Sequence, residues 1–220
     1  MIDAEVLVPE GWLLVPTSAG TERLRTRLVQ AVVQRYVPSS LPRDRAEPWR
    51  RELRKQLQGA VDEAAEAGAR SVLLPLVEYG EQRLPGSLLM TVLEDDPQVP
   101  PSVLLDAVLA DAGEDGMRLE VDGAPAARVQ QVVDSRRAGR AHPTRRVTYY
   151  VSHPDQAGVW GLLTFTVLTD GDLEHPGVLA VTAMFDAVVG TLLWVERDGG
   201  PSVDELLAQL EALVPAVSSS

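Results

Sequence analysis

The chain has 220 residues, a formal net charge of −12 and no cysteine. The missing cysteines exclude disulfides, thiolate metal sites and cysteine nucleophiles, and they are compatible with a reducing compartment, so we expect a cytoplasmic protein. The acidic balance argues against non-specific binding to a phosphate backbone, and we therefore expect no nucleic acid partner.

The N-terminal part of the chain predicts one strand and two helices. Trp12–Pro16 is a short apolar run that ends at proline, as strands often do. Thr21 can cap a first helix, and a second, longer helix is expected from Ala46 to Ala67, before Gly68. One stripe of this second helix is apolar and consists of Trp49, Leu53, Leu57, Ala60, Val61 and Ala64.

The rest of the chain predicts hairpins that alternate with helices. The expected strands cover 72–77, 86–94, 117–121, 126–133, 147–151 and 160–168. The expected helices begin at Pro101, at Pro176 and, after a capping Ser202, at Val203. The helix that begins at Pro176 is expected to continue to Val195, and the last helix to end at Leu213.

A stretch of the chain occurs twice. A shift of 75 residues, without gaps, aligns Val72–Ala112 with Val147–Ala187, and 12 of the 41 aligned positions are identical. Each copy has the order hairpin, acidic turn, proline-started helix. We therefore predict an internal pseudo-repeat (72–112 and 147–187) within a single domain, with halves at about 1–123 and 124–220.

These patterns together predict an α+β fold. About six strands with period-2 character, most of them joined by short turns, indicate an antiparallel sheet flanked by helices. Leu88, Met90 and Val92 occupy pleat positions equivalent to Phe165 and Val167, so both hairpins are expected to feed one core.

From the hydrophobicity of its segments we expect neither a secretory signal nor a membrane span. Met1–Glu5 is acidic and lacks the basic start of a secretory signal. The longest apolar run, Val178–Val195, has Asp186 in its middle, which would cost roughly 2.5–3.5 kcal/mol in a bilayer. We expect a buried core helix there and no membrane insertion.

No nucleotide-binding or catalytic motif is present, and we expect no cofactor. All three histidines precede proline, and His142 and His175 are expected at the same end of the last hairpin, near Asp170 and Asp172. One interpretation is a histidine–carboxylate site for metal binding or for acid–base hydrolysis. The alternative is that the two carboxylates pair with Arg145 and Arg146 while the histidines are solvated. A second acid–base candidate is the repeat-matched pair Asp111 and Asp186.

A basic face lies on the first half of the long helix. It consists of Arg50, Arg51, Arg54 and Lys55, at the end of the helix where the macrodipole disfavours cations. An acidic surface would stabilise it, either one within the chain, such as Glu94–Asp96, or one on an acidic protein partner. The oligomeric state does not follow from the sequence.

Three function classes remain open. The first is a non-catalytic protein-binding or accessory module, such as an adaptor or a chaperone, that uses its sheet surface or its basic helix. The second is a metal-dependent or acid–base hydrolase at His142 and His175. The third is a binder of a small apolar ligand, with Trp12, Trp160 and Trp194 around a pocket between sheet and helices.

The predicted architecture resembles two groups of proteins. An antiparallel sheet flanked by helices, with an N-terminal strand and a long terminal helix, resembles the PsbP-like α/β/α sandwich. The internal duplication of sheet and helix is similar to chaperones of type VII secretion systems. Both resemblances imply a small accessory or binding protein, and neither supplies a functional residue.

Overall fold

The computed structural model describes residues 2–36, 43–75, 78–79, 82–83, 86–134, 141–196 and 208. The predicted last helix, apart from residue 208, lies outside them. The helices are α1 (Glu22–Tyr36), α2 (Arg43–Glu66), α3 (Pro101–Ala112), the short 3₁₀ turn η1 (Gly113–Asp115) and α4 (Pro176–Val189). The strands are β1 (Ile2–Glu5), β2 (Trp12–Pro16), β3 (Ser71–Pro75), β4 (Glu78–Tyr79), β5 (Gln82–Arg83), β6 (Gly86–Glu94), β7 (Gly116–Val121), β8 (Ala124–Val133), β9 (Thr144–Ser152), β10 (Val159–Leu168) and β11 (Leu193–Glu196).

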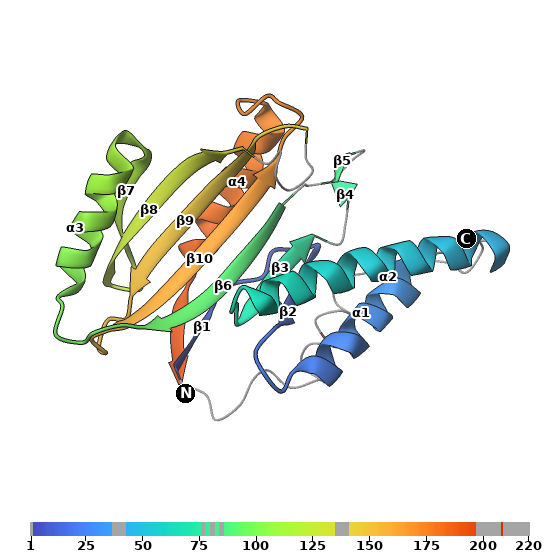
Figure 1. The fold of residues 1–220 in the computed structure, drawn as a ribbon, viewed down its shortest axis with the longest axis horizontal. Coiled ribbons are helices and arrows are strands. Elements are labelled where there is room, and N and C mark those ends of the chain that lie inside the picture. Colours follow the sequence, from blue (N-terminus) through green and yellow to red (C-terminus); the bar gives the residue numbers. More distant parts are fainter. Residues whose placement is uncertain are drawn as a thin grey trace.

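One seven-stranded antiparallel sheet dominates the fold, which confirms the predicted α+β class. Its strand order is β2-β3-β6-β10-β9-β8-β7. Two small ribbons, β1 with β11 and β4 with β5, complete the strands of the described residues. Figure 1 shows α4 and the β1–β11 ribbon on one face of the sheet, with α3 and the α1–α2 pair on the other.

The predicted repeat is visible in how β6 pairs with β10. Gly86 pairs with Val167, and the equivalent residues of the other copies, Gly161 and Val92, pair with each other. Leu89 pairs with Thr164, which lies 75 residues later. The register of the two central strands is therefore symmetric under the 75-residue shift.

The first strands of the two copies differ by one residue from this symmetry. Leu73 pairs with Leu88 in the first copy, whereas Tyr149, 76 residues after Leu73, pairs with Leu163 in the second. The ungapped alignment therefore matches Val72 with a residue on the opposite face. Val72 packs under α1 and α2, whereas Val147 packs on the α4 side.

Both hairpins feed one core, as predicted. The cluster under α4 includes Leu88 and Met90 from the first copy and Leu163 and Phe165 from the second. The Phe165 ring stacks on Phe185 of α4, and Trp12 meets the same Phe185 edge-on at 5.0 Å between ring centroids. This burial fixes α4 on the sheet.

The predicted helix 176–195 is wrong at its C-terminal end. Helix α4 ends at Val189, and after a turn at Gly190 the chain continues as β11, which pairs antiparallel with β1. The Thr191 hydroxyl donates to the carbonyl of Val188 (2.6 Å), which satisfies one of the last carbonyls of the helix. The apolar run is therefore two elements, and its partner strand at Ile2–Glu5 was not predicted.

Helix α2 departs from its predicted apolar stripe at one residue. Val61 and Ala64 are buried, but Trp49 is 54% exposed. The helix has 24 residues, or ~36 Å at ~1.5 Å per residue, and only its C-terminal half lies near the sheet (Figure 1). Trp49 belongs to the half that extends past the sheet, so no strand lies beneath it.

Candidate functional site

The predicted histidine–carboxylate site is a loop whose polar groups bind its own backbone. The His175 Nδ1 atom accepts from the Gly177 amide (3.1 Å) and caps α4. Asp172 accepts from the Glu174 amide (2.9 Å), and Asp170 accepts from the Asp172 amide (3.3 Å). These bonds shape the loop before α4 and direct three of the candidate side chains to local amides.

The remaining candidate, His142, is exposed and lies beside Gly171, where an added Cβ would come within 3.2 Å of its Nδ1 atom. Arg145 does not pair with Asp170 or Asp172 as predicted. Its side chain, 6% exposed, donates to Glu174 Oε1 (2.9 Å) and to the carbonyl of Leu173 (2.7 Å). Within the described residues, no group of three or more histidine and carboxylate side chains could hold a metal ion.

The predicted basic face of α2 is only partly a free surface. Arg50 is half-buried and donates to Glu47, one turn earlier, at 2.9 Å. Arg51, Arg54 and Lys55 are exposed. Three cations therefore remain on the half of α2 that extends past the sheet (Figure 1).

The three tryptophans do not surround one pocket, contrary to the prediction. Trp12 lies in the core under α4, whereas Trp160 packs with Leu105 of α3 on the opposite face. Trp194 lies against Gly161 of β10, which has no side chain, and against the ring of His153. Each ring is a packing anchor in a different place.

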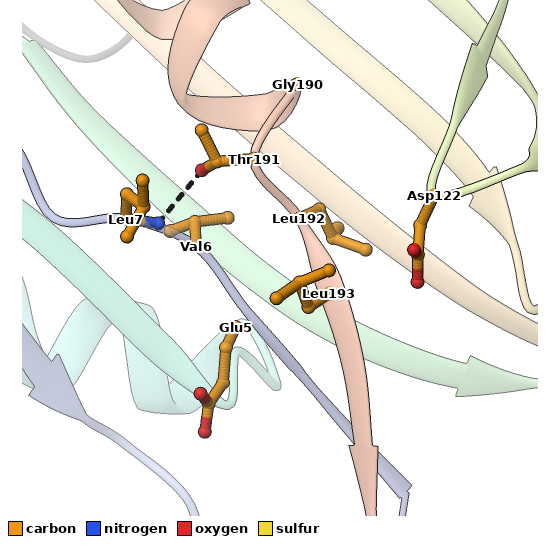
Figure 2. A pocket seen from close by; sticks show the side chains of 8 residues that line it. All are labelled: Glu5, Val6, Leu7, Asp122, Gly190, Thr191, Leu192 and Leu193. Atoms are coloured by element: carbon orange, nitrogen blue, oxygen red, sulfur yellow. Dashed lines mark hydrogen bonds between the residues drawn. The ribbon is translucent and has the colours of Figure 1, made fainter.

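A small pocket does lie beside the β1–β11 ribbon, and Figure 2 shows its lining. Its volume is about 300 Å3, at the lower limit of typical ligand sites. The lining residues are Glu5, Val6, Leu7, Asp122, Gly190, Thr191, Leu192 and Leu193. The Thr191 hydroxyl accepts a hydrogen bond from the Leu7 amide (2.9 Å) and so links the two chain segments that line the pocket. The carboxylates of Glu5 and Asp122 lie apart in this view, so no polar groups converge on a ligand.

Sequence reasoning paired Asp186 with Asp111, but the structure separates them. Asp186 accepts from Arg128 Nε (2.8 Å) and from the Tyr149 hydroxyl, on the α4 face of the sheet. Asp111 is exposed on α3, which packs on the opposite face. The two aspartates therefore cannot form an acid–base pair, and Asp186 instead holds α4 to β8 and β9.

Within the described residues, helices cover one face of the three central strands only in part: the α3 cluster reaches Trp160 and Tyr150, and the α1–α2 cluster reaches Leu89. In Figure 1, β6, β10 and β9 lie in front, between α3 and the α1–α2 pair. The side chains in the middle of this face are half-buried or exposed, and Leu93 is 45% exposed, whereas Trp160, Thr144 and Ser152 on the same face are buried. We call this middle part the open face; it consists of Ser87, Leu89, Thr91 and Leu93 on β6, Leu162, Thr164 and Thr166 on β10, and Arg146, Thr148 and Tyr150 on β9.

The chemistry of the open face differs from that of the whole chain. None of its ten residues is acidic, although the protein carries 32 Asp and Glu residues. Threonine and leucine dominate, the hydroxyls of Thr148 and Thr164 lie 3.3 Å apart, and Arg146 supplies a cation at one end. The sequence analysis proposed a sheet surface for binding but named none of these residues, although the threonines at alternate positions of β10 are a period-2 signal for them.

The open face has the width of one helix. Helix α2 packs over β3 and α3 packs over β8, and these strands are separated by four strand intervals. Four intervals of ~4.8 Å give roughly 19 Å. Two neighbouring helix contacts of ~8–10 Å each require about the same distance. A further helix could therefore lie between α2 and α3 and contact both.

Comparison with known proteins identifies no family. No family model and no curated protein matches the chain. Among solved structures, LpqN of Mycobacterium tuberculosis, described as involved in cell envelope biogenesis, has 10% identity and a TM-score of 0.47. This match covers 89% of this chain and 85% of LpqN.

Two structures of Mog1 are also similar. The Saccharomyces cerevisiae Ran-binding protein Mog1p has 15% identity and a TM-score of 0.33, and it covers 56% of this chain and 77% of its own. A Mog1 E65A mutant matches at 14% identity and the same TM-score, over 56% of this chain and 78% of its own. Identities and TM-scores this low transfer no functional residue, and the resemblance to PsbP-like proteins and type VII chaperones stays a prediction.

No helix of the described residues is long and apolar enough to cross a membrane.

Proposed function

We propose that the chain is a non-catalytic protein-binding module whose open face receives one helix of a partner protein. The observation that carries this proposal is that the described helices cover the surface of β6, β10 and β9 between α3 and the α1–α2 pair only in part. Sheets of α+β proteins normally bury an apolar face against helices. Within the described residues the helical layer is incomplete over the middle strands, where Leu93 and Leu162 offer apolar contacts beside Leu89, which packs against the α1–α2 cluster.

The partner helix is acidic on its polar flanks. The open face has no carboxylate to repel it, and Arg146 lies at one end to pair with it. The exposed cations of α2, Arg51, Arg54 and Lys55, offer a second contact for the same partner outside the sheet. Charge complementarity of this kind mainly accelerates encounter and selects the partner.

A hydrolase centred on His142 and His175 has weaker support. His175, Asp170 and Asp172 already accept local backbone amides, and a general base must reach a substrate proton. Arg145 and its bonds to the same loop further favour a structural role for this end of the sheet.

Substitution of matched leucines tests the proposal. Leu93 on the open face is 45% exposed and Leu179 on the opposite side of the molecule, on α4, is 41% exposed. Each is changed to glutamate, and proteins captured from a cell extract are compared by quantitative mass spectrometry. A partner identified in this way is then produced separately, and its affinity for each variant is measured.

Leu93→Glu is expected to weaken binding at least tenfold, because it adds a carboxylate to a surface that meets an acidic helix, and Leu179→Glu is expected to bind normally. Equal binding by the two variants would show that the open face is not the interface. A partner segment that binds in an extended form, seen by NMR, would exclude the helix.

A further inference from the structure

We propose that β7 pairs edge to edge with β7 of a second copy of this chain and extends the sheet across a two-fold axis. β7 is the outermost strand on its side of the sheet. It has six residues and no proline, and five of the six are exposed or half-buried, Val121 being the buried one. Such an edge presents unpaired N–H and C=O groups and is a template for another strand.

The opposite edge of the sheet is protected in ways that β7 is not. β2 ends in Pro16, and four of its five residues are buried. α3 lies on one face of β7, where Leu109 lies against Gly116 and Asp106 pairs with Arg118, but its buried contacts are further inside the sheet, with Ala127 of β8 and Trp160 of β10. No residue of β7 belongs to that cluster.

The β7–β8 turn determines which groups of β7 face outward. Asp122 and Gly123, both at positive φ (52° and 71°), form a two-residue hairpin turn that is closed by Val121 and Ala124. Hydrogen-bonded and non-hydrogen-bonded pairs then alternate along the hairpin. Glu120 lies opposite Pro125, which has no N–H, as expected of a non-hydrogen-bonded pair. The backbone groups of Arg118 and Glu120 therefore point away from β8.

Charge selects one register for the paired edges. Arg118 and Glu120 can lie opposite each other in the two copies, with Leu119 opposite Leu119. Each Arg118–Glu120 pair then exchanges both of its backbone hydrogen bonds and places opposite charges side by side. A shift of the second copy by two residues would put Arg118 opposite Arg118, and like charges directly opposite are destabilising.

The side chains of β7 suit this register on both faces. Arg118 and Glu120 share one face with α3, where Arg118 also forms an ion pair with Asp106. Met117, Leu119 and Val121 share the other face, and Met117 is 54% exposed. In the dimer, Met117 of each copy lies opposite Val121 of the other. An apolar row thus forms on one face and a charged row on the other.

The dimer is expected to be weak. A single strand pair buries less than the ~1,200–2,000 Å2 of a stable interface. Association should therefore depend on concentration, and sedimentation velocity between about 10 μM and 1 mM is the appropriate measurement. Detection of a monomer alone at every concentration would overturn the proposal.

Charge exchange tests the register. Arg118→Glu and Glu120→Arg each place like charges opposite one another, and each should raise the Kd for dimerisation by roughly tenfold. The double variant R118E/E120R restores opposite charges and should restore the original Kd. If the single variants dimerise normally, or the double variant stays as weak as they are, the register is wrong. Because Glu120→Arg leaves the Arg118–Asp106 pair intact, its result does not depend on that contact.

A proline tests the edge itself. Glu120→Pro removes an outward N–H but no hydrogen bond of the β7–β8 hairpin, so the thermal unfolding midpoint should change little while the dimer is lost. A dimer that persists in this variant would show that the copies associate elsewhere. If Glu120→Pro loses both the dimer and the native fold, the charge-exchange variants decide whether β7 forms the dimer, because they leave the backbone unchanged.

Discussion

The two faces of the same sheet differ in what covers them and in what their residues are. On β10, Leu163, Phe165 and Val167 are buried under α4, whereas Leu162, Thr164 and Thr166 between them are only half-buried. The strands alternate every second residue between a complete core and an open surface. The difference teaches that the middle strands are packed fully on the α4 face, whereas on the other face the buried clusters lie toward the two ends of the sheet, under α1 and α2 and under α3.

The largest expected effect comes from the covered face. Phe185→Ala removes a ring that is fully buried between Trp12 and Phe165 and should lower the free energy of unfolding by ~3–5 kcal/mol. Leu179→Ala, on the same helix but 41% exposed, is the control and should cost far less. Urea unfolding monitored by circular dichroism measures both. Similar losses in the two variants would mean that α4 is not held by the core under it.

A smaller effect is expected at the polar edge of the covered face. Asp186→Ala leaves the Tyr149 hydroxyl and Arg128 without their carboxylate and should cost ~1–3 kcal/mol. The repeat provides the matched control, because Asp111→Ala changes the equivalent but exposed residue and should cost less than ~0.5 kcal/mol. Equal costs would mean that the two aspartates have equivalent surroundings after all.

The sequence predicted the part of the fold that repeats and missed the part where the copies differ. Identities such as Gly86 and Gly161 indicated that β6 and β10 are equivalent. The alternation of apolar residues within each segment predicted that both are strands. No local pattern in the sequence indicates on which face of the sheet α3 and α4 pack. Val103 of α3 is exposed, whereas its counterpart Val178 of α4 is buried.

The candidate sites show the same limit. His175, Asp170 and Asp172 were rightly placed together near one end of the last hairpin, but residue type alone could not reveal that each accepts a local amide. The open face depends on which strands the described helices cover only in part. That property follows from the packing of α2 and α3 at a distance in sequence, not from the residues of β10 themselves.

The basic face of α2 should affect binding more than stability. Reversing Arg51 and Arg54 to glutamate, both exposed on the half of the helix that extends past the sheet, should change the melting temperature little. Partner recovery should fall, and most strongly at low salt, because exposed charges are screened as the ionic strength rises. Unchanged recovery at low salt would remove α2 from the interface and leave the open face alone.

The smallest effect is expected at the centre of the open face. Thr164→Val keeps the shape of the side chain and its preference for strands, and it loses only a half-exposed hydroxyl contact with Thr148. Unfolding free energy should therefore change by less than ~0.5 kcal/mol in urea. A loss well above ~1 kcal/mol would mean that this hydroxyl is buried in a bonded network, as it would be if another segment covered the strand. The stability of this one variant thus decides whether the two faces of the sheet really differ.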